Sequence, residues 1–169
     1  MKNYPFSVKN LTRTALLLAL TLAIQGFRLP PFMTGPLVNF MLILSTIIVG
    51  TAGGIIIGSI SPWIALMVGI LPAPLAPAVP FIMLGNAVYC LLFGLLHDGR
   101  RWLGVGAASL AKFLLIAGAV QFVLSLPTPV TQLLMIPQLI NALVGGAAAL
   151  VAATYLQRLL QAQADRYAG

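Results

Sequence analysis

Long apolar stretches follow one another along almost the whole chain, and only short connections separate them. A helix that crosses the hydrocarbon core of a bilayer needs about 20 mostly apolar residues. Runs of about this length fall at 11–27, 37–54, 55–71, 80–96, 103–125 and 131–160. The pattern therefore predicts an all-α integral membrane protein, with residues 1–169 forming a single domain of six transmembrane helices.

Composition agrees with this prediction and excludes a soluble domain. Hydrophobic residues make up 60% of the chain and charged residues only 7%. A soluble protein has about a quarter of its residues charged, because they must cover its surface. The net charge of +7 would suggest nucleic acid in a soluble protein. In a membrane protein it indicates topology instead, so no nucleic-acid partner is predicted.

Most of the basic residues lie at positions that would all fall on the same side of the membrane in a protein with six transmembrane helices. They lie before or at the start of the first run, between the fourth and the fifth, or at or beyond the end of the sixth: Lys2, Lys9, Arg13, Arg100, Arg101, Arg158 and Arg166. Lysine and arginine accumulate in cytoplasmic loops. Both termini are therefore predicted to be cytoplasmic.

Prolines mark the opposite side. Nine of the twelve lie in the three outer connections, four of them in "LPAPLAPAVP" at 71–80. Proline commonly marks helix ends, which would account for one or two per connection. Three or four per connection, beside Phe32, Met33 and Leu75, favour stiff apolar caps that pack over a pocket.

Several kinds of chemistry are excluded by missing residues. The chain has no phosphate-binding loop of the G-x-x-x-x-G-K-[ST] type. One histidine and two acids cannot assemble a catalytic triad or a two-metal site. The predicted spans contain no acidic residue for proton coupling. We therefore predict neither an enzyme nor a cofactor or metal site.

Uncharged polar residues gather toward the outer halves of the predicted helices. Polar groups in hydrocarbon face the protein interior, where they join helices or line a binding site. Their shared outward bias favours one pocket beneath the outer connections. Together with the basic Arg28 at the outer rim, they make up the predicted substrate-binding residues: Gln25, Arg28, Asn39, Asn86, Tyr89, Gln121, Gln138 and Asn141.

Lys112 is the one basic residue in the middle of a span. It lies nine residues before Gln121, and at about 100° per residue the two side chains point to opposite faces. With Gln121 in the pocket, we expect Lys112 to point away and extend toward the cytoplasm. The alternative is a buried cation that awaits an anionic substrate, although Arg28 at the outer rim is the favoured partner for such a group.

Small residues recur at a spacing of four in two places. Gly50, Gly54 and Gly58 predict a tight turn or a close approach of two backbones. Ala15, Ala19 and Ala23 give the first helix one smooth face.

Together these features resemble the substrate-binding S component of an energy-coupling factor (ECF) transporter. The resemblance covers nearly the whole chain. It includes Ala15-x-x-x-Ala19 and the stretches "GPLVNFMLILSTIIVG" and "LPAPLAPAVPFIMLGNAVY".

The resemblance implies a multi-pass protein of a prokaryotic cell membrane that captures a vitamin or related micronutrient from outside. It also implies docking, through Ala15, Ala19 and Ala23, on a transmembrane coupling protein that carries two ATPase subunits. Those partners would supply the ATP site that this chain lacks.

Two other functions stay open at this point. A stand-alone channel or facilitator would need a polar path through both halves of the membrane, whereas the inner halves here are mostly Leu, Ile and Phe. A structural subunit without a ligand would use its polar residues only to join helices.

Overall fold

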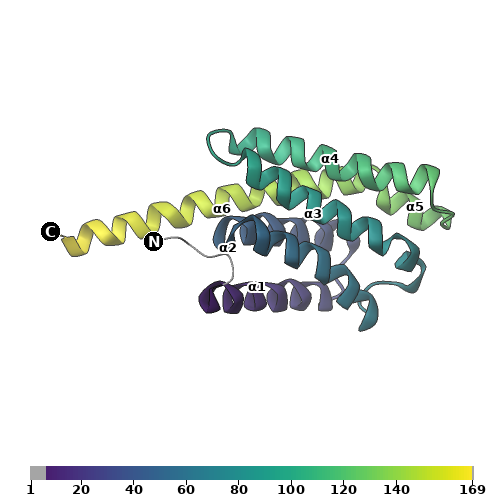
Figure 1. The fold of residues 1–169 in the computed structure, drawn as a ribbon, viewed down its shortest axis with the longest axis horizontal. Coiled ribbons are helices and arrows are strands. Elements are labelled where there is room, and N and C mark those ends of the chain that lie inside the picture. The colour runs from purple at the N-terminus through teal and green to yellow at the C-terminus, as the bar shows by residue number, and fades with distance from the viewer. Residues whose placement is uncertain (1–6, 169) are drawn as a thin grey trace.

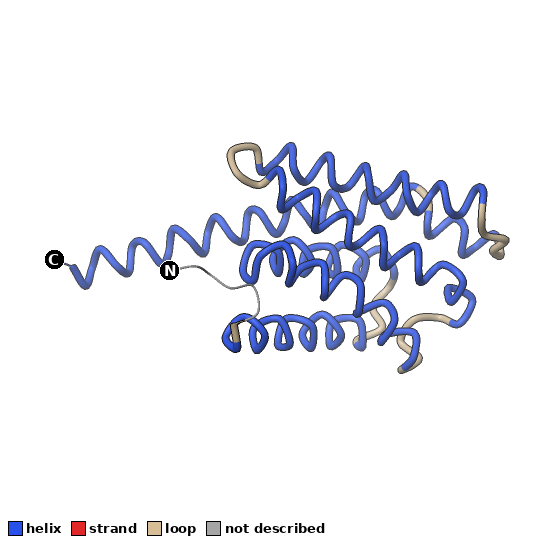
Figure 2. Tube along the Cα trace, in the orientation of Figure 1, coloured by secondary structure: helices blue, strands red, loops and turns tan. Residues whose placement is uncertain are grey.

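The structure is a computed structural model that describes residues 7–168, and all its regular elements in that range are helices (Figure 2). This confirms the predicted all-α class; Lys2 lies outside the described residues. The elements are α1 (Val8–Gly26), α2 (Pro31–Met67), the 3₁₀ helix η1 (Ala73–Ala78), α3 (Val79–Leu96), α4 (Arg101–Phe122), α5 (Thr128–Leu134) and α6 (Ile136–Ala168).

The long helix α2 is two arms, 31–49 and 51–67, that fold back on each other at Gly50. Gly50 has φ 84° and ψ 170°, a conformation that is essentially restricted to glycine. A Cβ on Gly54 would lie 3.2 Å from the Cα of Thr46, whereas a straight helix separates residues eight apart by about 12 Å. The predicted turn among these glycines is confirmed, but the predicted boundary at 54/55 falls four residues too late.

The predicted last helix, 131–160, is wrong as a single element. It is interrupted at Met135, which has φ −93° and ψ −125°. In an uninterrupted helix Pro137 would need an N–H that it lacks, and its ring would clash with the preceding turn. The helix therefore ends and restarts as α6, with Pro137 in the first turn, where proline is tolerated.

The helices form a bundle in which α2 is central (Figure 1). It packs against α1, α3 and α6, while α4 packs against α3 and α6. α1 packs chiefly against α2. The C-terminal part of α6 projects beyond the rest of the bundle, at the yellow end of the ribbon in Figure 1. The core includes the fully buried Leu42, Ile57, Tyr89 and Phe93.

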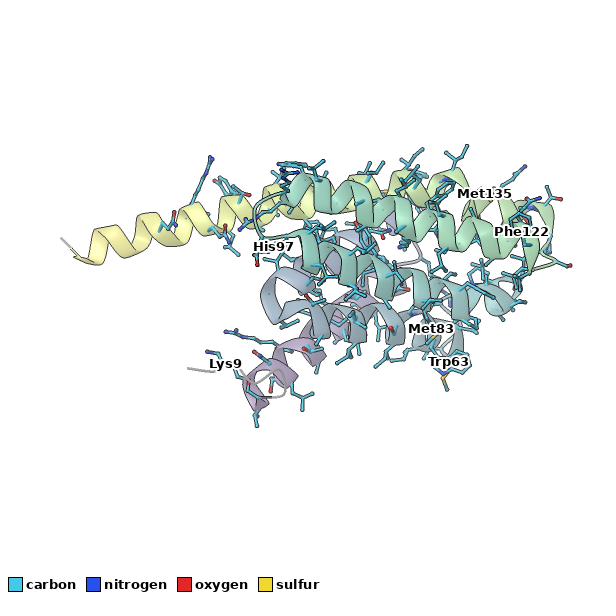
Figure 3. The ribbon with its side chains drawn as sticks, turned by 45° about the horizontal axis from the view of Figure 1, so that its top comes forward. Lys9, Trp63, Met83, His97, Phe122 and Met135 are labelled. Atoms are coloured by element: carbon cyan, nitrogen blue, oxygen red, sulfur yellow. The ribbon has the colours of Figure 1, made fainter. Side chains whose placement is uncertain are left out.

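The bundle has two chemically different ends. We call "proline end" the end formed by the connections 27–30, 68–78 and 123–127, and "basic end" the end formed by the Gly50 reversal and the turn 97–100. Figure 3 shows Lys9 and His97 toward the basic end, and Phe122 and Met135 toward the proline end. At the proline end the stretch "LPAPLAPAVP" forms η1, in which Ala78 is buried and Leu75 half-buried.

Within the described part of the chain, four helical segments are long and apolar enough to cross a membrane: Pro31–Met67, Ala73–Leu96, Arg101–Phe122 and Thr128–Leu159. α1 is not among them, and its 19 residues include Lys9, Arg13 and Gln25. Six crossings and cytoplasmic termini stay predictions.

The reversal at Gly50 can be tested by adding a single methyl group. We expect Gly50→Ala to lower the free energy of unfolding by about 1–3 kcal/mol, because a Cβ is strained at these dihedral angles. Gly106 in α4 is the matched control, since no heavy atom lies within 4 Å of an added Cβ. Gly106→Ala should raise stability by roughly 0.5–1 kcal/mol. Denaturant unfolding in detergent micelles measures both, and equal effects would contradict the role given to Gly50.

Candidate functional site: a cavity at the proline end

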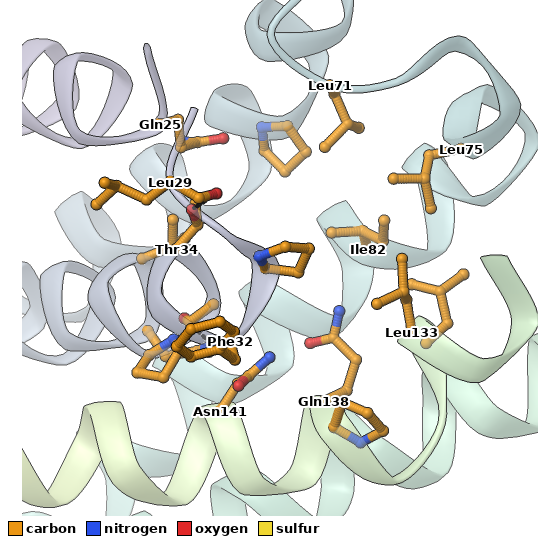
Figure 4. Close-up of a pocket in the computed structure, with 18 of the residues that line it drawn as sticks. Gln25, Leu29, Phe32, Thr34, Leu71, Leu75, Ile82, Leu133, Gln138 and Asn141 are labelled. Carbon is orange, nitrogen blue, oxygen red and sulfur yellow. Dashed lines mark hydrogen bonds between the residues drawn. The ribbon is translucent and has the colours of Figure 1, made fainter. Parts of the chain in front are cut away.

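A cavity of about 960 Å³ opens at the proline end. This volume lies in the upper part of the range of roughly 300–1,000 Å³ that small-molecule sites occupy. Its walls come from the end of α1, the α1–α2 connection, both arms of α2, the connection to η1, η1 itself, and helices α3 to α6. Most of the lining side chains are apolar, among them Leu29, Phe32, Leu71, Ile82 and Leu133 (Figure 4).

Six of the eight predicted site residues line this cavity: Gln25, Arg28, Asn39, Asn86, Gln138 and Asn141. In Figure 4, Gln138 and Asn141 rise from α6, while Gln25 and Leu29 lie on the opposite wall. The structure thus brings together residues from four different helices and one connection. Their contact with a substrate stays a prediction.

The two other predicted residues lie outside the cavity. Tyr89 is fully buried in the core below it, and its hydroxyl donates to the carbonyl oxygen of Ala142 at 2.7 Å. Gln121 is exposed near the end of α4.

The prediction that Lys112 points away from the pocket is wrong. It lines the cavity with only 3% of its surface exposed, and its Nζ donates to Asn39 Oδ1 at 2.6 Å. Lys112 is buried and Gln121 is exposed, so the two lie on opposite faces of α4, as the helical spacing predicts. The prediction that Gln121 faces the pocket is wrong. Lys112 also lies about 16 Å from either end of α4, which is too far for its side chain to extend to an interface.

Two contacts hold the Lys112 ammonium group at this depth. Asn39 Nδ2 donates to the carbonyl oxygen of Gly35 at 2.8 Å, so its Oδ1 is the atom that faces Lys112. The ring of Tyr89 lies beneath Nζ, 5.2 Å from ring centroid to nitrogen, a distance at which a cation is attracted to an aromatic face. Tyr89 therefore acts beside the cavity by positioning Lys112.

Asn86 and Ser61, which also belong to the cavity lining, each have one buried polar atom without a hydrogen-bond partner. Asn86 Nδ2 donates to the carbonyl oxygen of Gly58 at 3.0 Å, which leaves Oδ1 unpaired. Glycine favours this contact, because a Cβ at position 58 would lie 3.0 Å from the Cβ of Asn86, closer than most Cβ contacts in proteins. Ser61 Oγ is also buried without a partner. Ser61 was not among the predicted site residues. The feature that could have indicated it is a hydroxyl side chain immediately before Pro62 in an otherwise apolar run.

The connections at the proline end complete the cavity. Phe32, Leu71, Pro72 and Leu75 line it, as the cap prediction requires. Arg28, at φ 50°, donates from Nη2 to the carbonyl oxygen of Gly69 at 3.4 Å, so it joins the α1–α2 connection to the end of α2.

Not every proline of the cap contributes to the cavity wall. Pro74 and Pro77 are exposed and lie outside the lining. These two prolines restrict the backbone of η1, whereas Pro72 and Leu75 form part of the wall.

A separate surface lies along α1. Ala15, Ala19 and Ala23 are all exposed, and Leu16 and Leu20 beside them are exposed as well. The predicted small-residue face is thus unoccupied by the rest of the described chain.

Comparison with known proteins gives one match. The family model described as "ECF transporter, substrate-specific component" matches residues 9–157, from within α1 to within α6. The matched range includes every residue that lines the cavity. No curated protein and no solved structure matches the chain.

The contact between Lys112 and Asn39 can be measured with a double-mutant cycle of Asn39→Leu and Lys112→Met. Removing the amide leaves a buried ammonium group without its acceptor, which costs about 1–3 kcal/mol or more. We therefore expect Asn39→Leu to lower the free energy of unfolding by about 1–3 kcal/mol more in the protein that contains Lys112 than in the Lys112→Met background. Packing costs of the new leucine cancel in the cycle. A coupling energy near zero would show that the two groups do not interact.

Proposed function

Because the chain belongs to the family of ECF transporter substrate-specific components, we propose that it is the substrate-binding subunit of such an importer. Within this multi-pass membrane protein, the cavity at the proline end binds a vitamin or related micronutrient. The observation that carries the proposal is the cavity itself, with apolar walls and amide groups that converge from α1, α2, α3 and α6. Such a lining is typical of sites that enclose a small molecule and orient it through a few polar contacts.

The closed inner half of the bundle supports capture instead of free passage. Toward the basic end, below the cavity, the interior is filled by a cluster that includes Leu42, Ile57, Phe93, Val105 and Leu150. A stand-alone channel would need polar lining there as well. Release on the other side therefore requires a movement of the whole subunit or of its helices, driven by a partner.

Orientation follows from the distribution of charge. Arg100 and Arg101 lie at the basic end, and lysine and arginine accumulate on the cytoplasmic side. With the basic end inside, the proline end faces outward, and the cavity receives substrate from outside the cell.

The face of Ala15, Ala19 and Ala23 is the docking surface for the transmembrane coupling protein, whose two ATPase subunits supply energy. Small residues let two helix backbones approach closely in a membrane. α1 suits this role because it packs chiefly against α2 and leaves these alanines exposed.

Docking can be tested with Ala15→Leu/Ala19→Leu. Each leucine would keep the helices of the two proteins apart, so we expect uptake in cells that contain the coupling module to be abolished. Binding to the purified protein should be unchanged, because both residues lie outside the cavity. The exposed Ala107 of α4 provides the control: Ala107→Leu adds equal bulk elsewhere and should leave uptake intact. Loss of binding, or surviving uptake, would remove the docking role.

The cap can be tested with two neighbouring residues of η1. Leu75 lines the cavity and Pro74 does not. Leu75→Ala should weaken binding roughly 3- to 10-fold, since apolar contact with the substrate is lost, while Pro74→Ala should have little effect. Equilibrium binding of the co-purified small molecule to each variant measures the difference. Equal affinities would make this stretch a plain connection.

A further inference from the structure

The ammonium group of Lys112 is buried without a counter-charge. Its recorded hydrogen-bond acceptor is the neutral Oδ1 of Asn39. Among the side chains that the structure describes, the only carboxylate is that of Asp98, which lies 3.1 Å from His97 Nδ1 at the basic end. A buried cation is stabilised chiefly by an opposite charge and by further hydrogen bonds. The protein provides one neutral acceptor and an aromatic face, so the charge is only partly compensated.

Lys112 and two unpartnered polar atoms of the cavity lining are available to polar groups of a ligand. An ammonium group has three N–H donors, and one of them is engaged by Asn39. Ser61 Oγ is a second free donor on the lining, and Asn86 Oδ1 is a free acceptor. An anionic oxygen beside Lys112 would supply the missing charge and would accept a hydrogen bond from the ammonium group. A hydroxyl or N–H on the ligand would satisfy Asn86 Oδ1.

The number and position of the cations limit the charge of that ligand. Lys112 is one buried cation, whereas the exposed Arg28 lies at the rim and donates to the carbonyl oxygen of Gly69. A single buried cation balances a monoanion and leaves a dianionic phosphate under-neutralised. The rest of the wall, including Leu71, Leu75 and Ile82, suits an apolar body.

We propose that the substrate is a small amphiphilic monocarboxylate whose carboxylate pairs with Lys112 at the inner limit of the cavity. Its apolar part lies against the walls and the cap at the proline end. Lys112 then determines specificity, and it gains its counter-charge only when substrate is bound. This inference rests on the proposed function, because it names the class of molecule that the same cavity takes.

Matched probes of equal shape and different charge test this assignment. The probes are 4-phenylbutyrate and octanoate, each compared with its primary amide, added to the full chain in lipid nanodiscs. A ligand that binds the folded state raises the unfolding temperature, and at equal concentration a tighter ligand raises it more. We expect the acids to stabilise the wild-type protein and to bind at least about tenfold more tightly than the amides, because a charge-assisted contact is lost with the amide.

The variant Lys112→Met removes the cation and nearly preserves the shape of the side chain. It should abolish the preference for acid over amide. Arg100→Met also removes one positive charge, at the exposed turn of the basic end, and should retain the preference. A purely structural Lys112 would lower the stability of the ligand-free protein when replaced, without changing the ratio of acid to amide binding. If Lys112→Met does not fold, the wild-type comparison of acid with amide decides alone.

The outcomes separate this inference from the proposed function. Equal binding of acid and amide, or an acid preference that survives Lys112→Met, overturns the carboxylate assignment and leaves the cavity as a substrate site. Mass spectrometry of the small molecule that co-purifies gives an independent answer: a monocarboxylate supports the assignment, and a neutral or cationic compound overturns it. If nothing co-purifies and no probe binds, the proposed function fails as well.

Discussion

The contact between Lys112 and Asn39 is the interaction around which the cavity is organised. A cation in the middle of an apolar bundle is costly, and on insertion scales a lysine at the bilayer centre costs about 2.5–3.5 kcal/mol. The protein offsets part of that cost with one amide oxygen at 2.6 Å and the ring of Tyr89. Both partners are held by backbone carbonyls, those of Gly35 and Ala142. The polar contacts of α2, α3, α4 and α6 thus converge on one buried charge.

Close backbone approach makes this convergence possible. Gly50 lets α2 reverse within one residue, so that both of its arms contribute to the cavity lining. Gly58 then lets α3 come near enough for Asn86 to reach a backbone carbonyl. Small residues therefore determine where the amides lie, and the amides determine the polarity of the cavity.

Binding and association use different surfaces of the bundle. The proline end encloses the cavity with connections whose backbones are restricted by proline, so little conformational entropy is lost when the cap is ordered. The exposed alanine face of α1 lies outside the cavity. In the proposed importer, substitutions can therefore change docking without changing affinity, and the reverse.

Local features of the sequence were enough to predict the helical membrane class, the proline-rich caps and most of the amides around the cavity. Length, hydropathy and proline act within a single segment, so they can be interpreted without knowing its neighbours. Ala15, Ala19 and Ala23 were likewise predicted to share one face, which follows from helical spacing alone.

The tertiary structure decided the exact reversal at Gly50, the interruption at Met135, the burial of Lys112 and the inclusion of Ser61. The reason is physical. In a soluble helix the polar face marks the outside, whereas a membrane helix is apolar toward lipid and toward its neighbours alike. Helical spacing placed Lys112 and Gln121 on opposite faces, but only the packing of α4 against α3 and α6 determined which face is inside.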